Sequence, residues 1–274
     1  MKLPAWMAGE FVGTFLLVFF GCGSVAAAVL TGAQVGIFQV AIVWGIGIAT
    51  AIYITGALSG AHLNPAVTCA LATAGKFPAR RIAGYVTMQM LGAFAAAAVL
   101  HALFAGPLQA FESAHGIVRG AAGSEASAMI FGEFFPNLGG KPFTDEMRAL
   151  VSPLAAFAVE LVGTAVLVLV ILAVTDERNL ARPRELTAVT IGLTVTMLIS
   201  LLAPLTQAGF NPARDLAPRI WSALAGWGAV PFTANGTWGW LIVYVVAPLA
   251  GGQVGALVYH AFLRGHYVET RAGE

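Results

Sequence analysis

One tripeptide, Asn-Pro-Ala, occurs twice in this sequence, and its chemistry is the most readily inferred. The two copies are Asn64-Pro65-Ala66 and Asn211-Pro212-Ala213. Asn is a favourable N-cap and Pro suits the first turn of a helix, so each copy predicts a helix start. A helix N-terminus carries roughly half a positive charge, and an Asn carboxamide can donate hydrogen bonds. The pair therefore predicts a site that repels cations and binds neutral hydroxylic molecules, without a covalent step.

The residues that precede each tripeptide predict a row of hydrogen-bond acceptors. They are Gly60, Ala61 and His62 before the first copy, and Gln207, Ala208 and Gly209 before the second. Both stretches read as irregular backbone, whose carbonyl groups have no helical partners. Unpaired carbonyls at membrane depth are tolerated only where they line a wet path. We therefore expect these carbonyls to line a pore.

The composition and the apolar runs identify the elements that must position these residues. The chain has 274 residues, of which 58% are hydrophobic and 10% charged, whereas a soluble domain is nearer half apolar and a quarter charged. Six runs are long enough to cross a bilayer core of about 30 Å. We place them near 6–30, 35–55, 82–104, 151–174, 186–203 and 238–263. Shorter runs near 64–74 and 211–224 predict half-helices, and the predicted fold class is an all-α membrane protein.

An internal repeat relates the two halves of the chain. The segment 8–14 recurs at 158–164 with five identities in seven positions, and the Asn-Pro-Ala tripeptide recurs at an offset of 147 residues. Each half carries three crossings, so the second copy must be inverted relative to the first. The two half-helices should then enter from opposite faces and meet near the midplane.

The charges and the cysteines exclude several classes of function. A net charge of +1 provides no basic face for nucleic acid. Cys22 and Cys69 are too few for a disulfide framework or a cysteine-based metal site. No nucleophile–base or metal constellation is visible, which predicts that the protein is not an enzyme and needs no metal or other cofactor. His62 lacks partner ligands for a metal and is expected to contribute its carbonyl.

The motifs of this sequence resemble those of the aquaporin superfamily, and the resemblance covers essentially the whole chain. The segments 59–68 and 211–215 resemble its two signatures, while Asp215, Arg219 and the segment 225–228 resemble its glycerol facilitator, or aquaglyceroporin, branch. The resemblance implies six transmembrane helices with two reentrant half-helices, in a homotetramer with one pore per subunit. It also implies a passive channel for glycerol and other small uncharged solutes, with some water permeability.

The resemblance also implies a selectivity filter, and here the sequence departs from the branch. Arg214 and Trp44 match the filter arginine and tryptophan of glycerol channels. Counted back from Asn211, the usual glycine is Ile199 and the usual phenylalanine is Ala208. This set resembles that of plant nodulin-26-like channels, which are associated with glycerol, ammonia, small uncharged acids or metalloid hydroxides. That substrate range is therefore an alternative.

Two acidic residues within the spans leave a second alternative open. Glu10 and Glu160 are functional candidates by default at membrane depth, and a proton-coupled secondary transporter would need such groups. Their symmetric placement also suits a structural role, in which they accept hydrogen bonds from the reentrant loops. The resemblance implies the structural role, and we expect Asp215 to have one too, through an ion pair with Arg219 four residues on.

The distribution of basic residues predicts the orientation in the cell membrane. With both termini in the cytoplasm, nine Lys and Arg residues lie on the cytoplasmic side and five outside. We therefore expect a single channel domain over 1–274, with repeats at about 6–104 and 151–263. The segment 105–150 is then a folded extracellular loop, and 264–274 a cytoplasmic tail. The expected partners are the lipid bilayer, glycerol, small neutral solutes and water.

Overall fold

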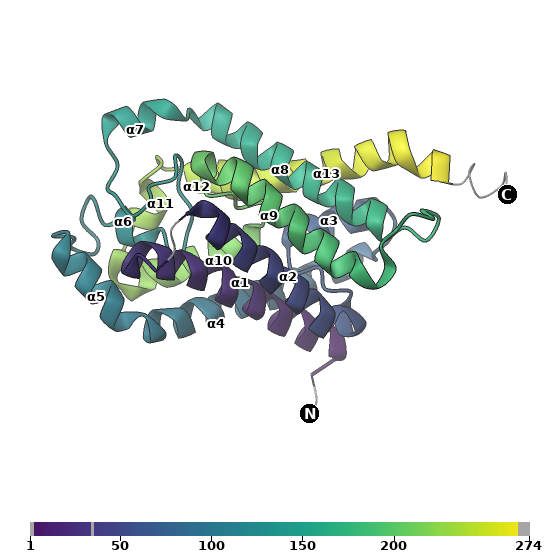
Figure 1. Ribbon diagram of the computed structural model, residues 1–274, viewed down its shortest axis with the longest axis horizontal. Coiled ribbons are helices and arrows are strands. Elements are labelled where there is room, and N and C mark those ends of the chain that lie inside the picture. Colours follow the sequence, from purple (N-terminus) through teal and green to yellow (C-terminus); the bar gives the residue numbers. More distant parts are fainter. Residues whose placement is uncertain (1–2, 34–35, 268–274) are drawn as a thin grey trace.

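The computed structural model describes residues 3–33 and 36–267, and regular structure within these ranges is helical. The α-helices are α1 Ala5–Thr31, α2 Ile37–Ser59, α3 Pro65–Thr73, α4 Ile82–Leu103, α5 Ala105–Ala114, α6 Glu125–Ala128, α7 Asp145–Leu150, α8 Pro153–Val174, α9 Thr187–Thr206, α10 Pro212–Ser222, α11 Val230–Thr233, α12 Gly239–Leu241 and α13 Ala247–Tyr259. Shorter helical turns are η1 Ala79–Arg81, η2 Arg184–Leu186, η3 Ala223–Trp227, η4 Ile242–Val246 and η5 His260–Arg264. Helices α5, α6, α7 and α11 gather at one end of the bundle (Figure 1), opposite the start of α1 and the end of α13.

The six predicted spans are confirmed, and so is the all-helical fold class. Within the described ranges, six helical stretches are long and apolar enough to cross a membrane, at Ala5–Thr31, Ile37–Ser59, Ala79–Leu103, Pro153–Val174, Arg184–Thr206 and Gly239–Tyr267. The half-helices predicted near 64–74 and 211–224 are α3 and α10, each beginning at the proline of its tripeptide. The segment 105–150 contains α5, α6 and α7. Within the predicted tail, residues 268–274 lie outside the described residues.

The two repeats interlock through their half-helices. Within the repeats, α1 packs against α2 and α4, while α8 packs against α9 and α13. Across the repeats, α3 packs against α13 and α10 packs against α4. Each half-helix is therefore held by the last span of the other repeat, which brings the two tripeptides together from opposite ends of the bundle.

A close contact between α2 and α9 joins the repeats at a second place. A Cβ atom on Gly45 would lie 2.5 Å from the carbonyl oxygen of Gly192, and one on Gly192 would lie 2.2 Å from that of Gly45. Only glycine allows this approach of the two backbones. The two helices that form one wall of the interior are thereby fixed to each other.

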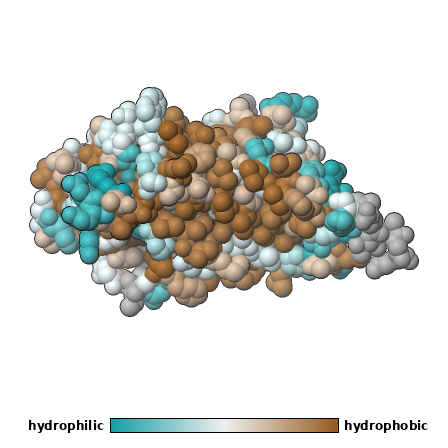
Figure 2. Space-filling view, turned by 90° about the horizontal axis from the view of Figure 1, so that it is seen from above, coloured by the Kyte–Doolittle hydropathy of each residue, from teal (hydrophilic) through white to brown (hydrophobic). Residues whose placement is uncertain are grey.

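The surface of the bundle is apolar where a membrane would surround it. Figure 2 shows hydrophobic residues over the middle of one face and hydrophilic residues concentrated toward the two ends. Leu154, Leu201 and Leu257 are among the large apolar side chains that are more than half exposed. Such an extensive apolar surface is suited to contact with lipid chains.

Candidate channel

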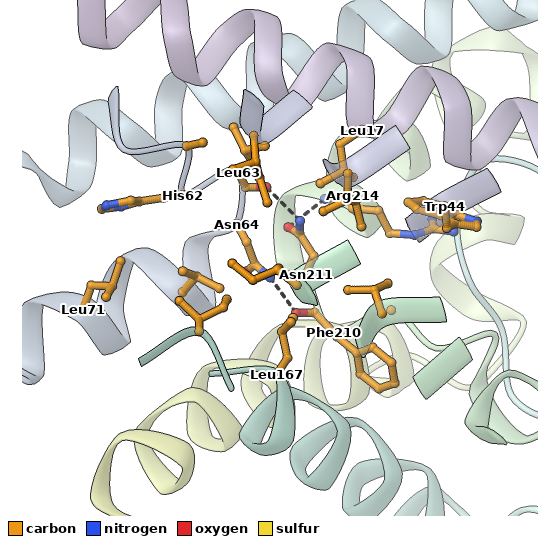
Figure 3. A pocket seen from close by; sticks show the side chains of 18 of the residues that line it. Leu17, Trp44, His62, Leu63, Asn64, Leu71, Leu167, Phe210, Asn211 and Arg214 are labelled. Carbon is orange, nitrogen blue, oxygen red and sulfur yellow. Dashed lines mark hydrogen bonds between the residues drawn. The ribbon is translucent and has the colours of Figure 1, made fainter. Parts of the chain in front are cut away.

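Asn64 and Asn211 meet at the N-termini of α3 and α10 (Figure 3). The Nδ2 atom of Asn64 donates to the carbonyl oxygen of Phe210, and that of Asn211 donates to the carbonyl oxygen of Leu63, both at 2.8 Å. Each Oδ1 atom accepts from the backbone N–H two residues on, at 2.8 and 3.0 Å. One N–H of each carboxamide thus forms a hydrogen bond to the other repeat. The second N–H of each carboxamide has no acceptor among the residues that the structure describes. Both asparagines line a cavity, into which the second N–H groups can donate.

The two reentrant loops that border this cavity have an unusual backbone. Several residues of each loop take left-handed conformations, with φ of 49° at Ala61, 53° at Leu63, 64° at Ala208 and 52° at Phe210. Such a conformation costs about 1–2 kcal/mol per non-glycine residue. Five of the six residues predicted to contribute carbonyls line one cavity, namely Gly60, Ala61, His62, Ala208 and Gly209, whereas Gln207 lines another.

Glu160 holds the second reentrant loop from α8. Its carboxylate accepts hydrogen bonds from the backbone N–H groups of Gly209 at 3.0 Å and Phe210 at 2.7 Å, and from the hydroxyl of Thr206 at 2.6 Å. The side chain is fully buried. Hydrogen bonds to a charged acceptor are stronger than those between neutral groups, so this carboxylate can offset the strain of the left-handed backbone.

Glu10 has the same place in the first repeat. It accepts hydrogen bonds from the backbone N–H groups of His62 and Leu63, at 3.0 and 2.9 Å. The amide of Gln89 on α4 donates to Glu10 at 2.7 Å and to the Thr68 hydroxyl at 3.0 Å. Our sequence analysis missed Gln89, because a single glutamine in an apolar span shows no spacing that would indicate its partner.

Three of the four predicted filter residues line both of two cavities, and we call the place between these cavities the constriction. The central cavity, of about 290 Å³, is lined by the reentrant loops and by apolar side chains of α1, α2, α8 and α9. The loop-side cavity, of about 410 Å³, is lined by Met129, Asn137 and Gly139 of the folded loop, by Gln207 and by residues of α1 and α2. Trp44, Ile199 and Arg214 line both cavities, and Ala208 lines the central one.

The guanidinium of Arg214 is held between an aromatic ring and a folded loop. It lies 4.4 Å from the centre of the Trp44 ring. It donates to the carbonyl oxygen of Phe131 at 3.3 Å and pairs with the carboxylate of Glu133 at 3.0 Å. Burial raises the pKa of Glu133, and Arg214 opposes that shift. Sequence reasoning missed Glu133, since no pattern in the loop marks which acidic residue folds back onto the bundle.

Asp215 and Arg219 form a buried ion pair on α10. Two hydrogen bonds of 2.7 and 2.9 Å join the guanidinium to the carboxylate, and both side chains are at most 1% exposed. The spacing predicted this pair, but its further partners lie outside α10. Arg219 also donates to the carbonyl oxygens of Pro231 and Glu133, and Asp215 accepts from the Glu133 N–H at 2.8 Å. The pair therefore ties the folded loop to the half-helix.

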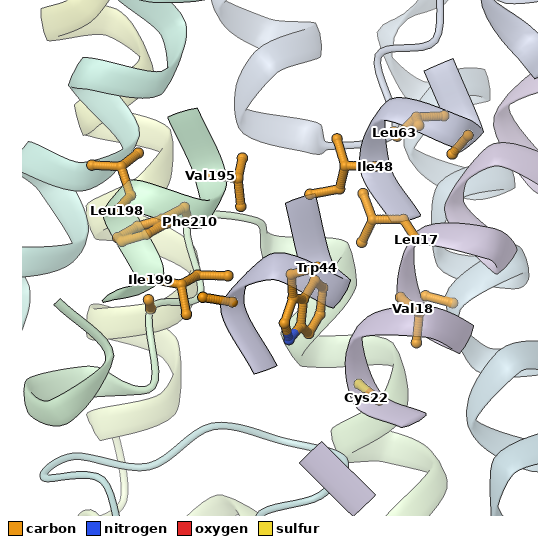
Figure 4. Close-up of a cluster of buried hydrophobic side chains, with 14 of the residues drawn as sticks. Leu17, Val18, Cys22, Trp44, Ile48, Leu63, Val195, Leu198, Ile199 and Phe210 are labelled. Carbon is orange, nitrogen blue, oxygen red and sulfur yellow. The ribbon is translucent and has the colours of Figure 1, made fainter. Parts of the chain in front are cut away.

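The corner beside Ala208 is not filled by its aromatic neighbour. The ring of Phe210 packs into a notch at Gly163 of α8, where a Cβ atom would lie 2.1 Å from the ring. Figure 4 shows this ring beside Leu198 and separated from Trp44. Phe210 is therefore part of the wall, and Ala208 leaves room next to the constriction.

Comparisons with known proteins agree with this architecture. A family model described as Major intrinsic protein matches residues 2–259. The glycerol uptake facilitator protein of Haemophilus influenzae is 40% identical over 266 residues, covering 97% of this chain and 96% of that protein. The propanediol uptake facilitator of Citrobacter freundii is 37% identical, over 94% of this chain and 91% of that protein.

A solved structure shares the fold over almost its full length. The aquaglyceroporin of Plasmodium falciparum is 28% identical and superposes with a TM-score of 0.81, covering 97% of this chain and 98% of that chain. The chain belongs to the major intrinsic protein family.

Proposed function

We propose that this protein is a passive channel for glycerol and other small uncharged solutes, with some water permeability. The observation that carries the proposal is the constriction, where the apolar side chains of Trp44 and Ile199 face the guanidinium of Arg214. A polyol can place its carbon backbone against the apolar wall while its hydroxyl groups bond to Arg214 and to the loop carbonyls. Relatives named as glycerol uptake facilitators support the same substrate class. The protein is a channel and not an enzyme.

The residues of the site have separate roles in this proposal. The selectivity filter consists of Trp44, Ile199, Ala208 and Arg214. The central donors are Asn64 and Asn211, and the carbonyls of both reentrant loops are the acceptors. Glu10, Glu160 and Asp215 hold the loops in place. We further propose a homotetramer in the cell membrane with both termini in the cytoplasm, which agrees with the apolar surface and the distribution of basic residues.

Exclusion of ions follows from the charges along the path. Arg214 places a guanidinium at the constriction, where it also pairs with Glu133, and two half-helix N-termini contribute partial positive charges at the centre. A cation would meet repulsion at both places, and an anion would lose its hydration against apolar walls. We therefore expect a solute flux without an electrical current.

The proposal is tested by flux measurements on proteoliposomes. We expect wild-type protein to accelerate swelling in a glycerol gradient relative to empty liposomes, with the same rate in the presence of a protonophore. Planar-bilayer recordings of the same preparation should show no proton or ion current, and Arg214→Val should weaken this exclusion. Accumulation of glycerol against its gradient when protons are supplied would contradict a passive channel and support a coupled transporter.

Replacing Glu160 with glutamine should reduce stability more than it changes selectivity. Glutamine brings donors to a place where backbone N–H groups need acceptors, and each poorly paired group costs about 1–3 kcal/mol. We expect a lower melting temperature and yield in detergent, with an unchanged ratio of glycerol to water permeability per surviving channel. Glu177→Gln, at an exposed position, is the control. A stable variant with altered proton dependence of flux would argue against this structural role.

A further inference from the structure

Gln207 has a backbone conformation that favours glycine over a residue with a side chain. It follows the last residue of α9 and precedes Ala208, with a φ of 62° in the left-handed region. Glycine adopts this conformation without a steric penalty and is the usual residue at such a helix end. Gln207 is nevertheless buried and lines the loop-side cavity. A side chain kept at a strained position indicates a specific use for it.

Both ends of the Gln207 amide bind the backbone of the folded loop. Its Oε1 atom accepts from the N–H of Phe134 at 2.8 Å, and its Nε2 atom donates to the carbonyl oxygen of Met129 at 3.2 Å. These two partners are the ends of the loop segment 129–134. The amide therefore closes this short segment against the reentrant loop, and its polar atoms are used for that purpose rather than for solute.

The segment closed in this way carries both groups that hold the filter arginine. The carbonyl of Phe131 and the carboxylate of Glu133 lie between the two attachment points, and both contact Arg214. Since residue 208 is alanine, no large side chain at that corner supports the guanidinium. Asp215 and Arg219 hold the backbone of Glu133 inside this segment, and Gln207 holds its two ends. The distance of the guanidinium from Trp44 and Ile199 then depends on both sets of contacts.

We propose that Gln207 is a positioning residue for solute selectivity, which acts through the loop segment 129–134 on the guanidinium of Arg214. The proposal rests on the proposed function, because it assumes that Arg214 limits which solutes pass. Loss of the amide would let the segment and the guanidinium move away from Trp44. The passage would then admit solutes larger than glycerol more readily.

The test compares Gln207→Gly with a matched control on the same loop. Glycine preserves the backbone conformation and removes the amide. Asn235→Ala removes another amide that binds the loop backbone at both ends, through the N–H and carbonyl of Phe135, but Asn235 lines neither cavity. Stopped-flow light scattering of proteoliposomes gives the erythritol-to-glycerol permeability ratio for each protein.

We expect this ratio to rise about fivefold in Gln207→Gly, the size expected from loss of one hydrogen-bonded tie, and to stay within about twofold of wild type in Asn235→Ala. If Gln207→Gly does not fold, Gln207→Asn serves instead, because the shorter amide cannot reach both partners and should also raise the ratio. Adding Gln207→Gly to Arg214→Val should change the ratio by less than about twofold, since coupled residues are not additive.

Three results would overturn the inference while leaving the channel itself in place. They are an unchanged ratio in the Gln207 variant, an equal rise in Asn235→Ala, and a full rise in the Arg214→Val background. Failure of the proposed function would be distinguishable, because wild-type protein would then show no glycerol flux above that of empty liposomes.

Discussion

Arg219→Met should remove most of the folded channel from the membrane. The substitution leaves the carboxylate of Asp215 buried without its cation, and breaking a buried pair in this way costs about 3–5 kcal/mol. It also removes the donors to the carbonyl oxygens of Pro231 and Glu133, so the folded loop loses one of its attachments to α10. Yield in membranes and the melting temperature of purified protein in detergent measure the effect.

Two further variants distinguish the effect of breaking the buried ion pair from the general effect of losing an arginine. Arg148→Met removes an exposed guanidinium that donates to the carbonyl oxygen of Ala234, and we expect a change below about 1 kcal/mol. Combining Arg219→Met with Asp215→Leu should recover part of the loss, since no unpaired charge remains. Wild-type stability in the single Arg219 variant would mean that water or lipid reaches Asp215.

The largest change in selectivity should come from a double substitution at the constriction. Ala208→Phe with Ile199→Gly places an aromatic ring in the open corner and removes the branched side chain from the facing wall. Glycerol gains an apolar surface opposite Trp44, whereas water gains no hydrogen-bonding partner. We expect the glycerol-to-water permeability ratio to rise about tenfold, the lower end of what one well-placed apolar group contributes to discrimination.

The control for this pair of substitutions is Ile191→Gly. Ile191 lies on the same helix and lines the central cavity, but it does not border the loop-side cavity. It therefore shares the cost of a glycine in a helix, about 1 kcal/mol, without changing the constriction. An unchanged ratio in the double variant, measured by stopped-flow light scattering, would show that the filter lies at other positions.

The sequence predicted those parts of the structure that are determined by local chemistry. Half-helix α3 begins at Pro65 and α10 at Pro212, because an Asn cap followed by Pro determines a helix start within a few residues. The inverted repeat then required the N-termini of the two half-helices to meet. In the structure, the carboxamides of Asn64 and Asn211 each donate to the loop that precedes the other asparagine. Ion pairing within one helix was equally predictable for Asp215.

The parts that could not be predicted depend on contacts between distant segments. Glu133 is 81 residues before its partner Arg214, and the amide of Gln207 reaches a loop more than 70 residues earlier. Neither residue belongs to a periodic or recurring pattern, so only the folded chain indicates its role. Phe210 illustrates the same limit, since only the folded chain shows that its ring packs into the notch at Gly163.

The reciprocal bonds of the two central asparagines have a consequence for the kinetics of transport. A rocking cycle that exposes a binding site first to one side and then to the other has to separate the repeats, and this would break both bonds at once. The contact of Gly45 with Gly192 would have to open as well. We therefore expect a path that does not close in each cycle and a solute flux that rises with the gradient, without a turnover step that saturates.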